Sequence, residues 1–241
     1  MRDTTLLFKL METDAAQGKL EKDAEETIPL LLDVAAEDLK AEACLKALEW
    51  TEKIWETRKA PQSLLAAFSR RLNVIGNDAY AAKQFRAAET AFRILSRSGD
   101  ITGSNNYAYM IRRGEVADAS LRDPAGILRI LRKGIGEKDA FSMANAALTL
   151  ALMVGEEKDW RLADSMFSRM PDDQALFVEL WWENVAKAGE EEGWLVLFFL
   201  LRHRKIISSD LGSIRTIAEH LRNNLRGFPE WLARVEPEDN P

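Results

Sequence analysis

Apolar residues recur three and four positions apart through most of the chain, as in the stretch "AEDLKAEACLKALEWTEKIWETR" that ends at Arg58. This spacing is typical of amphipathic helices, because residues three or four apart lie on the same helical face. Ala, Leu, Glu, Lys and Arg dominate, whereas β-branched runs and hairpin turn pairs such as Asn-Gly are missing. The pattern therefore predicts an all-α protein.

Segments rich in Gly, Pro, Ser and charged residues separate the helical stretches. The first is "KAPQS" around Pro61; the later ones are "SGDITGS", "RRGE", "RDPAG", "RKGIGEKD", "VGEEKD", "RMPDD", "KAGEEEG", "ISSDLG" and "RGFPE". Asp123 before Pro124 is typical of an N-cap followed by proline at the first helical position, and Pro29 also indicates a helix start. We expect helices of about 10–20 residues joined by short turns.

The stretch "GNDAYAAKQFRAAETAF", from Gly76 to Phe92, has a more specific spacing. It resembles a tetratricopeptide repeat, a helix–turn–helix unit of about 34 residues. If the unit begins at Ser69, Gly76 takes the small-residue position of the first helix and Phe85 opens the second. Ala88 and Phe92 then supply the alanine and the aromatic residue that pack the pair. Ala79, Lys83 and Asp100 depart from the family pattern, which prefers tyrosine, glycine and proline there.

The pattern recurs twice. "RRGEVADA" matches the family's turn through Gly114 and Ala119, although Asp123 and Pro124 cut its second helix short. "EKDWRLADSMF" matches again, with Trp160, Ala163 and Phe167 spaced like Phe85, Ala88 and Phe92. The gap before it is longer and contains the extra helix "PAGILRILRKG", an irregularity similar to Sel1-like repeats.

The resemblance implies an α-solenoid of antiparallel helical hairpins. We expect a single all-helical domain over 1–235, with N-terminal helices over 1–62, repeats over 69–171 and C-terminal helices over 172–235. Residues 236–241 are expected to form a flexible tail.

In the tetratricopeptide family, the first helices of successive repeats line a concave groove that receives a partner protein or peptide. Carried over to this sequence, the resemblance places these residues in the groove: Arg70, Asn73, Asn77, Tyr80, Asn105 and Arg112. Asn73 and Asn77 share a helical face, so their amides could bind an extended peptide backbone. Asn145 and Thr149 stand where a full carboxylate clamp would require basic residues. The alternative is that these residues form ordinary solvated faces.

Composition narrows the choice of partner. The 241 residues carry a formal charge of −6, which counts against nucleic acid and suits a basic protein partner. Cys44 is the only cysteine, and its alanine and leucine neighbours predict a small buried residue rather than a nucleophile. The start lacks the apolar run of a signal peptide, and the eight residues of "WLVLFFLL" are too few to span a membrane. We expect a cytoplasmic protein without a membrane segment.

The sequence shows no pattern typical of catalysis, so we expect no enzymatic activity, cofactor or metal site. His203 and His220 have no cysteine or carboxylate at metal-ligand spacing. "KGIGEKD" lacks the third glycine of a dinucleotide loop. The three consecutive glutamates from Glu190 to Glu192 suit the start of a helix, where the positive end of the helix dipole stabilises carboxylates.

Two further segments leave alternatives open. "RHRK", from Arg202 to Lys205, suits the negative end of a helix dipole, with a site for phosphate or an acidic peptide as the alternative. Trp181 and Trp182 point about 100° apart on a helix. We expect both to pack in the core. The alternative is that one packs in the core and the other reaches a surface or the next helix pair, where an exposed tryptophan would be a binding anchor.

The resemblance thus predicts a protein-binding module, and two roles fit it. One is an adaptor or scaffold that holds a peptide in its groove. The other is a stoichiometric inhibitor, such as a bacterial immunity-type protein whose acidic surface caps a basic toxin. A helical enzyme or small-ligand sensor is the competing class. The oligomeric state and the identity of the partner remain open.

Overall fold

A computed structural model describes residues 4–16, 24–37, 42–58 and 62–235. Residue contacts divide the chain into two compact units, Met1–Ser120 and Leu121–Pro241, and each is described by itself. The described residues form helices without a strand, apart from an isolated bridge between Ser209 and Gly212. The all-α prediction is therefore confirmed, while the single-domain organisation stays a prediction.

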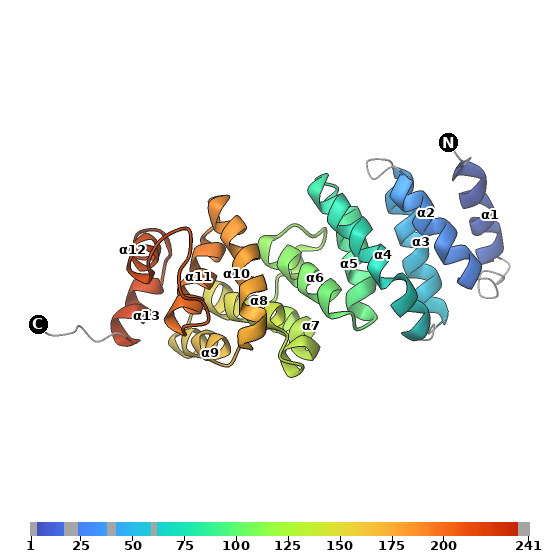
Figure 1. Cartoon of the computed structure of the whole chain (residues 1–241). Helices are drawn as coiled ribbons and strands as arrows, with labels where there is room; N and C mark the ends of the chain where they lie inside the picture. Colours follow the sequence, from blue (N-terminus) through green and yellow to red (C-terminus); the bar gives the residue numbers. More distant parts are fainter. Residues whose placement is uncertain (1–3, 17–23, 38–41, 59–61, 236–241) are drawn as a thin grey trace, which may run out of the picture. The chain divides into compact units, whose positions relative to one another are not determined.

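The described part of unit 1 is built from six helices, several of which pack on their neighbours in the sequence (Figure 1). They are α1 (Thr4–Ala16), α2 (Ala24–Glu37), α3 (Glu42–Arg58), α4 (Gln62–Ala81), α5 (Phe85–Arg97) and α6 (Ile101–Arg113). Helix α2 packs on α3, α4 packs on α5, and α5 packs on α6. Further contacts join α2 to α4 and α3 to α5, so successive helices alternate between two layers. An ion pair between Arg71 and Asp33 links α4 to α2 within one layer.

The α4–α5 pair forms as its sequence predicts. Phe85 is the first residue of α5, and Ala88 and Phe92 are buried. A Cβ atom added at Gly76 would lie 2.6 Å from the Phe92 ring, so the absence of a side chain lets this ring lie against α4. In the turn between the helices, Lys83 has a φ of 60°. This left-handed conformation is the one for which the repeat family prefers glycine.

Local signals define the ends of α6. The side chain of Asp100 accepts a hydrogen bond of 2.6 Å from the Gly103 amide, which makes it the N-cap. Gly114 ends the helix in a left-handed conformation with a φ of 73°. Where a complete repeat would have its second helix, only one 3-10 turn, η1 (Ala119–Leu121), follows.

Unit 2 contains the remaining helices. They are α7 (Pro124–Gly136), α8 (Ala140–Thr149) continued by the π-helical turn η2 (Leu150–Val154), α9 (Glu157–Ser168), α10 (Asp172–Lys187), α11 (Glu191–Arg202), α12 (Ile214–Asn224) and α13 (Phe228–Val235). The carboxylates of Asp123 and Asp139 cap α7 and α8, and the hydroxyl of Ser213 caps α12. The N-cap predicted at Asp123 is thus confirmed.

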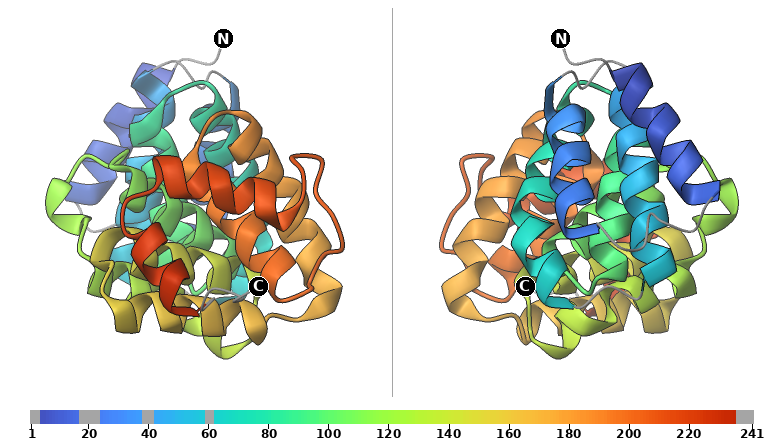
Figure 2. Two further views of the ribbon diagram at one scale, coloured as in Figure 1. Left: turned by 90° about the vertical axis from the view of Figure 1, so that its left-hand side faces the viewer. Right: turned by 90° about the vertical axis from the view of Figure 1, so that its right-hand side faces the viewer.

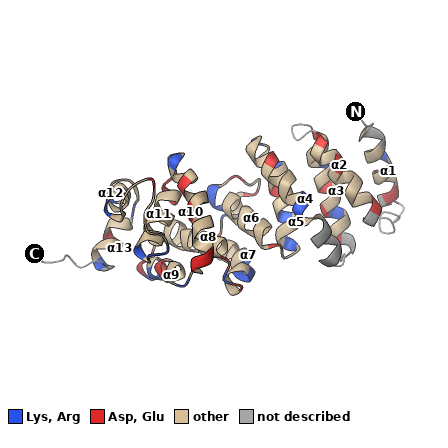
Figure 3. Ribbon diagram, in the orientation of Figure 1, with Lys and Arg blue, Asp and Glu red and all other residues tan. Residues whose placement is uncertain are grey.

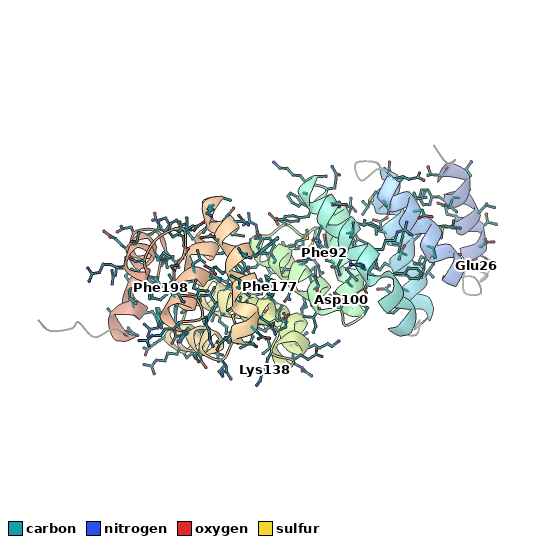
Figure 4. All side chains as sticks on the ribbon, viewed as in Figure 1. Glu26, Phe92, Asp100, Lys138, Phe177 and Phe198 are labelled. Atoms are coloured by element: carbon teal, nitrogen blue, oxygen red, sulfur yellow. The ribbon has the colours of Figure 1, made fainter. Side chains whose placement is uncertain are left out.

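Aromatic side chains from α9, α11 and α13 fill the centre of unit 2. Trp160 stacks on Trp231 with ring centroids 5.5 Å apart, and Phe198 (labelled in Figure 4) packs edge-on against Phe228 at 5.0 Å. Burial of such large rings supplies much of the stability of a helical unit of this size. Between α11 and α12, residues 203–213 form a loop at the edge of unit 2 (left view of Figure 2).

Two sequence-based expectations are wrong. Pro29 lies inside α2 rather than at a helix start. Trp181 is 51% exposed, whereas its neighbour Trp182 is 1% exposed and packs in the core as expected. The break predicted at Pro61 and the tail predicted over 236–241 fall outside the described residues.

Candidate functional site

Two of the predicted groove residues, Asn77 and Tyr80 on α4, contact side chains of α6 in unit 1. The Nδ2 group of Asn106 on α6 donates a hydrogen bond of 3.3 Å to Oδ1 of Asn77 on α4. One turn further along, the rings of Tyr80 and Tyr109 lie edge to face with centroids 6.2 Å apart. The two helices therefore present amide and aromatic groups side by side, although Asn106 and Tyr109 are not among the residues that the resemblance placed in the groove.

Tyr80 is held in place by a carboxylate. Its hydroxyl donates to Oε2 of Glu115 at 2.8 Å, while Nε of Arg113 donates to the other oxygen at 3.1 Å. Burial and the hydrogen bond to Glu115 raise the pKa of Tyr80 above its ordinary value. The phenol therefore stays protonated at neutral pH and acts as a hydrogen-bond donor.

The other predicted groove residues have different surroundings. Arg70 is exposed, and Asn73 is partly buried with its Oδ1 atom accepting no hydrogen bond from the described residues. Asn105 and Arg112 are buried, with 8% and 4% of their surfaces exposed. The Arg112 guanidinium lies 5.6 Å from the centre of the Tyr109 ring. These six residues therefore do not form one open surface: Arg70 and Asn77 are exposed, and the others are partly or fully buried.

Helix α10 in unit 2 exposes an apolar face that includes Trp181, a residue that the sequence predicted to be buried. The four large apolar residues of this face, each more than half exposed, are Leu176, Phe177, Leu180 and Trp181. They are spaced three and four apart, so they lie on one side of the helix (Phe177 is labelled in Figure 4). We call these four residues the α10 apolar face.

The opposite side of α10 is sealed by the core of unit 2. Ala175, Val178, Trp182 and Ala186 are buried there. Both sides of the helix are therefore apolar, and a helix that is apolar all round is ordinarily buried. The signal for the α10 apolar face, a spacing of three and four, is the same as the signal for a core face.

The loop over 203–213 is tied to a third side of α10. Lys205 pairs with Asp172 at 2.6 Å, and the Glu183 carboxylate accepts hydrogen bonds from the Ser209 hydroxyl at 3.0 Å and the Asp210 amide at 2.9 Å. These bonds hold the loop beside the helix and leave the α10 apolar face uncovered within unit 2.

Glu179, which lies near Glu183 and Asp210, makes the stability of the folded state depend on pH. Burial, and then the charges of Glu183 and Asp210, raise the pKa of Glu179 above its ordinary value of 4.5. Because the folded pKa is the higher one, ionisation of Glu179 destabilises the folded state at neutral pH. This cost is relieved as the pH falls through the folded pKa, and the relief is complete below the unfolded value.

We therefore expect Glu179→Gln to raise the thermal unfolding midpoint of the chain at pH 7 by about 2 °C. The two proteins should converge below a pH of about 4, where Glu179 is protonated in both the folded and unfolded states. Thermal unfolding followed by circular dichroism from pH 3 to pH 8 measures the difference, and any pH dependence shared by the two proteins cancels. A difference that stays constant over this range would contradict the assignment.

The remaining candidate residues from the sequence contact other side chains of the protein, cap a helix or are buried. In "RHRK", the Arg202 and His203 side chains both reach Oδ1 of Asp164, at 3.1 and 2.8 Å. The His220 ring stacks on Trp194, and its Nε2 atom lies 3.1 Å from Oε2 of Glu191. Glu190 is the N-cap of α11, as its sequence position suggested. Cys44 is fully buried in α3.

The described residues contain neither a metal-binding cluster nor a membrane-spanning helix. They contain no group of three or more His, Cys, Asp or Glu side chains placed to hold a metal ion. Within the same residues, no helix combines the length and the apolar character needed to cross a membrane.

Comparison with known proteins adds no family assignment. No family model matches the chain, and no curated protein or solved structure matches it significantly.

Proposed function

We propose that the chain is a non-enzymatic protein-binding module, an adaptor that holds a protein partner on the α10 apolar face. The observation that carries the proposal is the exposure of Trp181 and Phe177 beside two leucines on one helical face. Exposed apolar patches of a few hundred Å² are often functional in soluble proteins. Tryptophan is enriched among the residues whose truncation costs an interface most of its affinity.

A tetratricopeptide-like solenoid is part of this proposal. It is supported by the close approach of Phe92 to Gly76 in the α4–α5 pair. Trp160, Ala163 and Phe167 are buried on α9 at the spacing of Phe85, Ala88 and Phe92 on α5, which suggests that the same packing rule operates in both units.

The test is affinity capture from a lysate of the organism that encodes the chain, with the purified full chain as bait. We expect the variant carrying Trp181→Ala and Phe177→Ala to lose at least about 90% of each specifically captured protein, because truncation of an aromatic hot spot costs roughly 2 kcal/mol or more. The matched control is Leu162→Ala, which truncates an exposed leucine of α9 in the same unit. It should capture as much as the wild type.

Salt distinguishes the adaptor from the acidic inhibitor. Binding through the α10 apolar face should persist at high ionic strength, since salt screens charges and does not weaken apolar burial. Capture of a single basic protein that disappears at high salt and is unaffected by the two alanine substitutions would overturn the proposal. It would favour an acidic cap on a basic toxin instead.

A further inference from the structure

The exposed side of α10 continues beyond its four apolar residues. Successive residues turn by 100°, so Asp173 and Lys187 lie on the same side of the helix as Leu180. Asp173 is seven residues before Leu180 and Lys187 is seven residues after it. Two full turns separate Leu180 from each charge, which is about 10 Å in either direction. An acidic band at the start of α10 and a basic residue at its end are visible in Figure 3.

This arrangement of charges is self-complementary. When two identical helices lie antiparallel with Leu180 at the two-fold axis, the Asp173 carboxylate of each helix faces the Lys187 ammonium of the other. A two-fold interface repeats each contact twice, so both ends gain an ion pair of opposite charges. The antiparallel orientation also sets the dipoles of the two helices in the favourable sense.

We propose that the occupant of the α10 apolar face is a second copy of this chain, bound through antiparallel pairing of the two α10 helices. The inference rests on the proposed function, namely that the α10 apolar face binds protein, and it names the partner. Leu176, Phe177, Leu180 and Trp181 form the apolar centre of the interface. Asp173 and Lys187 set the orientation and the register.

The area of the face sets the strength of the dimer. Its four side chains, each more than half exposed, offer on the order of 400 Å² of apolar surface per copy. Ile207, between the tethers of the loop at Lys205 and Ser209, is fully exposed but is not counted in this area. The total buried by two copies is at the low end for specific complexes. We expect a reversible dimer with a dissociation constant on the order of 10–100 µM.

Lys187 can take part without disrupting its own unit. Its ammonium lies 3.5 Å from Glu183 and 3.2 Å from Asp210, whose side chain is largely exposed. The pair with Asp210 is exposed and contributes little to stability, so its rearrangement on pairing costs little. Glu183 keeps its hydrogen bonds to Ser209 and Asp210 and continues to hold the loop.

The experiment is sedimentation velocity on the full chain from about 5 to 500 µM, a range that brackets the expected dissociation constant. The wild type should change from monomer to dimer over this range. Asp173→Lys alone and Lys187→Glu alone should each weaken the dimer roughly tenfold at low salt, because each variant sets like charges against each other twice. An equimolar mixture of the two variants should recover the wild-type dimer, because only the mixed pair restores both attractions.

The mixture separates pairing from misfolding, since a variant that fails to fold cannot be rescued by another chain. Glu137→Lys, a charge reversal at an exposed position after α7, is the matched control and should dimerise like the wild type. A wild type that stays monomeric at the highest concentration overturns the inference. So does a mixture that dimerises no better than its components.

Failure here is distinct from failure of the proposed function. If the chain stays monomeric but its capture of a foreign protein still depends on Trp181 and Phe177, the proposed dimer is refuted. The proposal that the α10 apolar face binds protein then stands. A dimer that forms equally well with both residues replaced by alanine would place the pairing elsewhere, and it would also overturn this inference.

Discussion

Phe92→Ala is expected to destabilise unit 1 by about 3–5 kcal/mol, the usual cost of removing a buried aromatic ring. The Phe92 side chain is 2% exposed and lies against Gly76, so its removal opens a cavity between α4 and α5. Hydrogen exchange of the full chain, read by mass spectrometry peptide by peptide, measures the loss of protection in α4 and α5 specifically. Urea unfolding followed by circular dichroism gives the accompanying loss in free energy.

Phe177→Ala is the matched control, because it removes the same side chain from a position that is 62% exposed. It should change the free energy of unfolding by less than about 0.5 kcal/mol. Gly76→Ala provides the second check. When Gly76→Ala is the only substitution, the added methyl group clashes with the Phe92 ring. When Phe92→Ala is also present, the methyl group enters the cavity that the ring has left. The two substitutions should therefore be non-additive by about 1 kcal/mol or more, and simple additivity would contradict the contact.

Gly193→Ala is expected to destabilise unit 2 by about 2–3 kcal/mol, the upper part of the range for overpacking. A Cβ atom at Gly193 would lie 2.3 Å from the Ala186 backbone nitrogen and 2.5 Å from the Trp182 carbonyl oxygen. Both are main-chain atoms of α10, so the clash can be relieved only by moving one helix away from the other. The thermal unfolding midpoint and hydrogen exchange in α10 and α11 report this change.

Gly136→Ala is the control for the intrinsic helix preference of alanine. Gly136 is the last residue of α7, and no atom lies within 4 Å of an added Cβ. The substitution should leave stability unchanged or raise it by up to about 1 kcal/mol. Equal effects at Gly136 and Gly193 would show that α10 and α11 are not in the close contact described.

Much of the fold could be predicted because its signals are local. The spacing of Gly76, Phe85 and Phe92 lies within one helical pair, so neighbouring residues in the sequence carry all of its information. Asp123 followed by Pro124 starts α7 for the same reason, since capping involves only the first turn of a helix. Pro29 was misassigned because burial of Ile28, Leu31 and Leu32 keeps α2 helical around the proline.

The sequence could not predict which of the groove candidates are exposed, because exposure is not a local property. Asn77 and Tyr80 contact side chains of α6. Asn105 and Arg112 have the same polar character but are buried. The residue type indicates a preference for solvent, whereas the packing around α6 decides whether solvent reaches the side chain.

The sequence by itself determined that α10 is a helix with apolar residues on both sides. It did not determine which side is exposed, because each side repeats its apolar residues at the same spacing. The tertiary structure makes that choice through Gly193, whose lack of a side chain allows α11 to approach the backbone of α10 at Trp182 and Ala186. Once that side is sealed, Trp181 and its neighbours must face outward.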